Sequence, residues 1–165
     1  ILLVIYLSTG SISTYKRIAT RLLLEREQGI EKLDPVADFI KNNTTKEDVL
    51  LVWGANPGIN FRAKRSSLSP YYMFYPLYVP SPFTEKMSEE FYLALVTEKP
   101  KYIIDNSYTA NGLIPSLNTK ERQRRLLQNA YYDTPYQSKV LNFIDTHYQS
   151  LTSIKGNDIY MLTTP

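Results

Sequence analysis

The sequence of 165 residues contains no cysteine and a single histidine, His147. The absence of cysteine excludes disulfide bonds, thiol nucleophiles and thiolate metal sites. One histidine cannot build a multi-histidine zinc site, so His147 is expected to be a structural residue near the end of a helix. The sequence also lacks a phosphate loop ending in Gly-Lys-Ser/Thr and a Gly-x-Ser-x-Gly nucleophile motif. We therefore expect neither a metal nor a cofactor.

A large excess of charge of one sign is also missing. The chain has 19 basic and 16 acidic residues, which give a formal net charge of +3. Domains that bind nucleic acid usually concentrate a larger basic excess on one face, so a nucleic-acid partner is not expected. The length corresponds to one ordinary domain, and the hydrophobic fraction of 43% is typical of a globular protein. Tyrosine is abundant, with 14 copies, which suits half-buried strands as well as sugar-facing or membrane-boundary surfaces.

The N-terminal segment ILLVIYLSTGSIST begins with seven apolar or aromatic residues. It is shorter than the about 20 residues that span a bilayer, and no basic region precedes it as in a secretory signal. Residues 1–13 are interpreted as the end of a transmembrane helix or a linker, with a buried first strand as the alternative. An amphipathic helix is predicted from Thr14 to about Glu27, and residues 14–165 are interpreted as a single soluble domain.

Helix and strand signals then alternate along the chain. A helix is predicted to begin at Pro35, with Asp34 as its N-cap. Residues 49–53, VLLVW, form a continuous apolar run, which is typical of a strand covered on both faces. A further helix within residues 81–100 is predicted to stop at Pro100, and a second buried strand, KYIID, follows at once.

The last third of the chain contains a loop, two helix signals and a hairpin signal. The loop covers residues 106–119, and the helices are predicted over 120–135 and 136–148. Two strand-like runs flank KGND, in which Gly156 and Asn157 are expected to take the positive backbone dihedrals of a tight turn. Together these elements predict a layered α/β domain with a mixed sheet, helices on both faces and a C-terminal antiparallel hairpin.

Each of the two predicted buried strands ends at a position where an open α/β sheet can bind a ligand. Asp105 is a weak candidate, because open α/β sheets bind ligands at the carboxyl ends of their strands. Aspartate after a strand also forms turns, so a structural role is the alternative. The loop GANPG offers Gly54 and Gly58, but Pro57 removes a backbone donor from it. A nucleotide site at this loop is therefore not expected.

A basic and tyrosine-rich segment follows this loop. Arg62, Lys64 and Arg65 precede Tyr71 and Tyr72, a combination that can face a membrane surface or a substrate. The alternative is that the charges are solvated and the tyrosines belong to the core. A second basic run is interpreted as a solvated face, and its members are Lys120, Arg122, Arg124 and Arg125.

Three segments carry a family resemblance: DPVADFIKNNTTKEDVLLVWGANPGINFRAKRSS, EKPKYIIDNS and THYQSLTSIKGNDIYMLTT. Their order resembles the C-terminal domain that follows the last membrane helix in bacterial polytopic glycosyltransferases of the GT-C class, of the dolichyl-phosphate-mannose mannosyltransferase type. The resemblance covers roughly residues 34 to 163. The matching residues are Asp48, Trp53, Gly54, Pro57, Ile59, Phe61, Arg65, Pro100, Tyr102, Ile103, Ile104 and Asp105.

The resemblance implies an extracytoplasmic domain at the cell membrane that assists sugar transfer from a polyprenyl-phosphate donor. Its implied partner is the transmembrane part of the same polypeptide, with anionic lipid or a glycan acceptor as further partners. In that family the catalytic acidic residues lie in loops between membrane helices, so the resemblance assigns no catalytic residue to this chain. The alternatives are a self-contained α/β enzyme or nucleotide-binding protein, and a noncatalytic carbohydrate-binding or interaction module.

Overall fold

The structure is a computed structural model, and it describes residues 34–71, 77, 81–110, 113–127 and 135–163. The chain divides into two units, and the described helices and strands all belong to the second, Pro35–Pro165. The predicted helix from Thr14 to Glu27, the segment 1–13 and Tyr72 lie outside the described residues. None of the described helices combines the length and the apolar composition needed to cross a bilayer.

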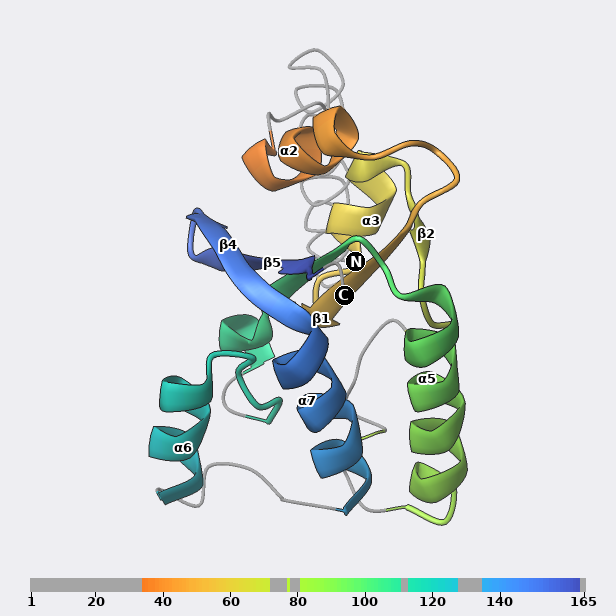
Figure 1. The fold of residues 1–165 in the computed structure, drawn as a ribbon, viewed down its shortest axis with the longest axis vertical. Coiled ribbons are helices and arrows are strands. Elements are labelled where there is room, and N and C mark those ends of the chain that lie inside the picture. Colours follow the sequence, from red (N-terminus) through yellow and green to blue (C-terminus); the bar gives the residue numbers. More distant parts are fainter. Residues whose placement is uncertain (1–33, 72–76, 78–80, 111–112, 128–134, 164–165) are drawn as a thin grey trace, which may run out of the picture. The chain divides into compact units, whose positions relative to one another are not determined.

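A five-stranded mixed sheet forms the centre of the second unit (Figure 1). The strand order is β2-β1-β3-β5-β4. β1 is parallel to β2 and β3, whereas β5 is antiparallel to both β3 and β4. The predicted mixed sheet and C-terminal antiparallel hairpin are therefore confirmed. The strands are β1 Val49–Gly54, β2 Ser66–Ser67, β3 Tyr102–Asn106, β4 Tyr148–Ile154 and β5 Asn157–Leu162.

The predicted helices and strands among the described residues occur in the expected order, and the structure adds α3 and β2, which no sequence pattern predicted. Helix α2 begins at Pro35, whose missing N–H is tolerated in the first turn of a helix. Helix α5 ends at Glu98, and Lys99 closes it in the left-handed conformation with φ of 43° before Pro100. The predicted loop after β3 begins with a short 3₁₀ helix. The helices are α2 Pro35–Asn43, α3 Gly58–Ala63, α5 Thr84–Glu98, η1 Ser107–Ala110, α6 Thr119–Leu127 and α7 Pro135–His147.

Strand β1 is buried on both faces, as its continuous apolar run predicts. Leu51 and Trp53 belong to a core cluster with residues of α5 and α7. Leu50 and Val52 belong to a second cluster with residues of α2 and α3. Figure 1 shows α2 and α3 on one side of the sheet and α5 and α7 on the other. Helices on both faces are therefore confirmed, and the sheet separates two apolar cores.

The turn between β4 and β5 differs from the expectation at one residue. Positive φ values occur at Lys155, 49°, and Gly156, 78°, which suits a two-residue hairpin turn. Asn157 is instead the first residue of β5, so the expected positive dihedral there is wrong. Its side-chain amide donates to the carbonyls of Ile154 and Lys155, and its amide oxygen accepts from Asn106. Asn157 thus stabilises the turn from outside it.

Helix α7 ends at His147, which confirms the expected position of this residue. Its ring stacks on Phe143, with centroids 4.2 Å apart, and its Nδ1 lies 2.9 Å from the Phe143 carbonyl oxygen. The His147 carbonyl accepts hydrogen bonds from the backbone and hydroxyl of Thr163. These contacts join the end of α7 to the end of β5.

Candidate functional site

The carboxyl ends of β1 and β3 lie side by side, because Trp53 pairs with Asp105 and Gly54 with Asn106. Open α/β sheets bind ligands outside such ends. Gly54 has φ of 146°, and a Cβ there would lie 2.7 Å from the carbonyl carbon and oxygen of Asn106. Glycine is required here by the dihedral and by the close approach of the two strands. Packing alone therefore explains the glycine that ends the VLLVWG run.

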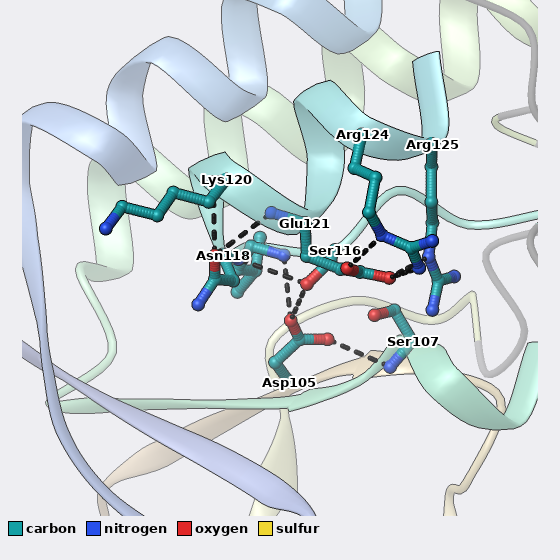
Figure 2. Close-up of polar contacts among 9 residues, drawn as sticks. Asp105, Ser107, Ser116, Asn118, Lys120, Glu121, Arg124 and Arg125 are labelled. Carbon is teal, nitrogen blue, oxygen red and sulfur yellow. Dashed lines mark hydrogen bonds and ion pairs between the residues drawn. The ribbon is translucent and has the colours of Figure 1, made fainter. Parts of the chain in front are cut away.

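Asp105 is buried near the end of β3 and accepts three hydrogen bonds (Figure 2). One carboxylate oxygen accepts from the backbone N–H of Ser107 at 2.9 Å. The other accepts from the backbone N–H of Leu117 at 2.7 Å and from the hydroxyl of Ser116 at 3.0 Å. One donor follows β3 directly, and the other two precede α6. Asp105 therefore ties both ends of the loop between β3 and α6 to the sheet.

Burial raises the pKa of the Asp105 carboxyl above its ordinary value, because the charged form loses its contact with water. The hydrogen bonds from Ser107, Leu117 and Ser116 act in the opposite direction, since they stabilise the carboxylate, but they do not outweigh burial. Raised carboxyl pKa values occur at catalytic sites and in structural networks alike. The raised pKa therefore does not distinguish a catalytic from a structural role for Asp105, and its position and hydrogen-bond partners must do so.

Two further side chains hold the same loop. The indole N–H of Trp53 on β1 donates to the Pro115 carbonyl at 2.7 Å, inside the core. Arg122 on α6 donates to the Leu117 carbonyl at 3.3 Å and forms an ion pair with Asp145 on α7. Arg122 is buried, so its expected place on a solvated face is wrong. It is a structural link between α6, α7 and the loop.

The beginning of α6 is charged on its outer side. Asn118 caps the helix, because its side-chain oxygen accepts from the backbone N–H groups of Lys120 and Glu121 at 3.1 and 3.2 Å. Arg124 donates to Glu121 at 2.7 and 2.9 Å, and Arg125 donates to it at 2.8 Å. These hydrogen bonds lower the pKa of Glu121 to about 2. Glu121 is thus ionised and paired within its own helix.

A cavity of about 180 Å³ lies beside Asp105, and its lining includes Glu121, Arg125 and Asp158. Both carboxylate oxygens of Asp105 accept from the protein, and Glu121 is paired with arginines. Among the residues that the structure describes, no three histidine, aspartate or glutamate side chains are placed to hold a metal ion. Chemically the arrangement is a hydrogen-bond network that orders the loop after β3.

Arg65, from the predicted basic patch, is held by groups at the C-terminal ends of α2 and α3. Its guanidinium donates hydrogen bonds of 2.8 to 3.3 Å, and all of the acceptors are uncharged. This geometry fixes the segment after α3 against the end of α2. The acceptors are the Thr44 hydroxyl and the carbonyls of Lys41, Thr44, Ala63 and Lys64.

The rest of the predicted patch is divided between a cleft and an exposed turn. Arg65 and Tyr71 line a cleft of about 480 Å³, together with Phe61 and the serines of β2. The Tyr71 hydroxyl donates to Glu90 on α5 at 2.6 Å, and this hydrogen bond raises the pKa of Tyr71. Arg62 and Lys64 are exposed on the turn that ends α3. Phe61, on the same turn, has an exposed fraction of 83%.

Comparisons with known proteins identify no family for this chain. No protein-family model matches it, and no curated protein matches it. Among solved structures, it is similar to the C-terminal globular domain of an oligosaccharyltransferase from Archaeoglobus fulgidus, with a TM-score of 0.38 and 13% identity over 78% of this chain and 95% of that one. A likeness of this extent is too low to assign a fold family or an activity.

Proposed function

We propose that this chain is the extracytoplasmic C-terminal domain of a polytopic membrane glycosyltransferase of the GT-C class. In this role it assists the transfer of a sugar from a polyprenyl-phosphate donor and performs no catalysis of its own. One observation carries the proposal: the three sequence segments that resemble this class form neighbouring strands of one sheet. VLLVWG is β1, YIIDN is β3, and the C-terminal segment supplies β5 and β4.

This arrangement supports the resemblance because the segments are far apart in the sequence. Together they contain all five strands of the sheet, so the resemblance covers the whole sheet rather than one isolated motif. Here Trp53 and Gly54 pair with Asp105 and Asn106, which lie near the end of the second segment. The third segment adds β5 directly against β3, where Ile104 pairs with Ile159. The shared residues therefore correspond to one structural unit.

An accessory role agrees with the chemistry of the described residues. The buried carboxyl of Asp105 uses both oxygens to hold the loop before α6, and Arg122 and Trp53 hold that loop from other sides. Such a network stabilises a surface rather than transforming a substrate. In this proposal the catalytic acids and the donor site belong to the transmembrane part of the same polypeptide.

A sugar-transfer assay tests this assignment. The isolated chain and membranes that contain the full polypeptide are each incubated with hexoses linked to polyprenyl phosphate and candidate acceptors. We expect no turnover by the isolated chain, turnover by the membranes, and reduced turnover when residues 35–163 are deleted from the full polypeptide. Turnover by the isolated chain that disappears in a folded Asp105→Asn variant would show that the domain is itself an enzyme.

A further inference from the structure

Phe61 is an exposed aromatic residue in a basic environment. Its exposed fraction of 83% is larger than that of any other exposed large hydrophobic residue in the described part of the chain. Residues 58–65, GINFRAKR, contain three basic residues and no acidic residue. Scattered exposed apolar residues are ordinary, but an aromatic ring flanked by basic side chains is typical of surfaces that contact membranes.

The turn that ends α3 presents these groups together. Arg62 and Lys64 are exposed, and Lys64 closes α3 in the left-handed conformation with φ of 54°. Arg65 adds a positive charge whose hydrogen-bond acceptors are all uncharged. On α5, Glu90 accepts from the Tyr71 hydroxyl and lies 3.9 Å from the Lys86 ammonium group. The segment 58–65 therefore carries a positive formal charge.

We propose that Phe61, Arg62 and Lys64 form a contact site for an anionic lipid bilayer. The Phe61 ring enters the interfacial region, where aromatic side chains are favoured, and the two basic groups contact lipid phosphates. Arg65 does not contact lipid directly, because its head group is bound to backbone carbonyls. The exposure and the charge carry this inference by themselves, and it does not depend on the proposed function.

The expected strength is modest, as for other interfacial contacts. A basic group near an anionic surface changes affinity about fivefold, so loss of both should weaken binding about 25-fold. Loss of the Phe61 ring should weaken binding about tenfold, because its apolar area then no longer leaves water. Salt should weaken binding as well, since the screening length falls from about 10 Å at 0.1 M to about 3 Å at 1 M.

Vesicle cosedimentation of the chain tests the site. The probes are vesicles of phosphatidylcholine alone and vesicles with increasing phosphatidylglycerol. The test variants are Phe61→Ala and the double variant Arg62→Gln, Lys64→Gln. The matched controls are Phe83→Ala, which removes an aromatic ring that is 67% exposed, and the double variant Lys46→Gln, Lys120→Gln, which changes net charge equally.

We expect binding that rises with phosphatidylglycerol, falls with salt and is weakened by the two test variants but not by the controls. In a Phe61→Trp variant, the emission of the introduced indole should shift to shorter wavelength on addition of anionic vesicles. Absence of binding at low salt, equal loss in test and control variants, or an unchanged emission would each overturn the site. None of these results would affect the sugar-transfer assay, which tests the proposed function. The lipid site and the proposed function can therefore be refuted independently of each other.

Discussion

Replacement of Asp105 by asparagine should lower the free energy of unfolding. The carboxylate accepts three hydrogen bonds, from the backbone N–H groups of Ser107 and Leu117 and from the Ser116 hydroxyl. An asparagine side chain offers one oxygen and one NH₂ group, so at least one buried N–H donor would face another donor. The loop before α6 would then lose part of its connection to β3.

The size of the loss follows from the burial of the site. A buried donor without a partner costs about 1–3 kcal/mol, and we expect a decrease in this range for Asp105→Asn. This is a substantial fraction of the about 5–15 kcal/mol by which domains are usually stable. Asp105→Ala should cost more, because it leaves all three donors without an acceptor.

The pH dependence provides a second test of the same residue. Burial raises the folded-state pKa of Asp105 above the ordinary value of an aspartate carboxyl, so the folded state holds the proton where the unfolded chain has released it. Stability from this group is therefore fully present below that value and is lost as the pH rises through the folded-state pKa. The free energy of unfolding of the native chain should fall over this window, and the asparagine variant should lack this contribution.

Urea unfolding provides the measurement, because Trp53 is the only tryptophan and is fully buried. Its fluorescence reports on the core beside the Asp105 loop. Asp158→Asn, which changes another carboxylate lining the same cavity, is the matched control and should change stability by less than about 0.5 kcal/mol. Equal midpoints for Asp105→Asn and the native chain, or identical pH profiles, would refute the role assigned to Asp105.

Three further predictions concern the glycine turn and the basic segment. Gly54→Ala should lower the free energy of unfolding by about 3 kcal/mol or more, because the added Cβ would lie 2.7 Å from the Asn106 backbone. In the same urea assay, Gly156→Ala should lower it by about 1–2 kcal/mol, because a Cβ there meets nothing within 4 Å and only the positive φ is unfavourable. Arg65→Lys should lower stability by about 1–2 kcal/mol, because lysine cannot reproduce the guanidinium hydrogen bonds, and faster amide exchange at the end of α2 would show it. Calorimetry with ATP and NAD should show no binding at the GANPG loop, and submillimolar binding that is lost in Gly58→Ala would contradict this.

Local patterns were sufficient to predict the architecture. The continuous apolar run at residues 49–53 predicts burial on both faces, and Pro35 and Pro100 mark a helix start and a helix end that the structure confirms. Such signals depend on neighbours within a few positions. The prediction of a positive φ at Asn157 was wrong, because this residue belongs to β5. Its side chain bonds to Ile154 and to Asn106, and Asn106 is too distant in the sequence for a turn motif to indicate the contact.

The sequence predicted where the candidate site lies, but it did not predict which residues bond to Asp105. The position of Asp105 follows from the end of a buried strand, whereas its partners Ser116 and Leu117 lie beyond an irregular loop that has no periodic signal. Arg122 belongs to a basic run, and nothing local distinguishes it from its exposed neighbours, since its partner Asp145 lies on another helix. Arg65 binds backbone carbonyls, which every residue carries, so the sequence holds no mark of that contact.

The central claim, that this domain belongs to a membrane glycosyltransferase, is tested most directly by locating the native polypeptide. An antibody raised against residues 35–163 is used to probe membrane and supernatant fractions of cells that express the gene, before and after alkaline extraction. We predict a polypeptide much larger than the 19.1 kDa of this chain that stays with the extracted membranes and is cleaved by protease added from the extracytoplasmic side. A species of this chain's own mass found in the supernatant would contradict the claim.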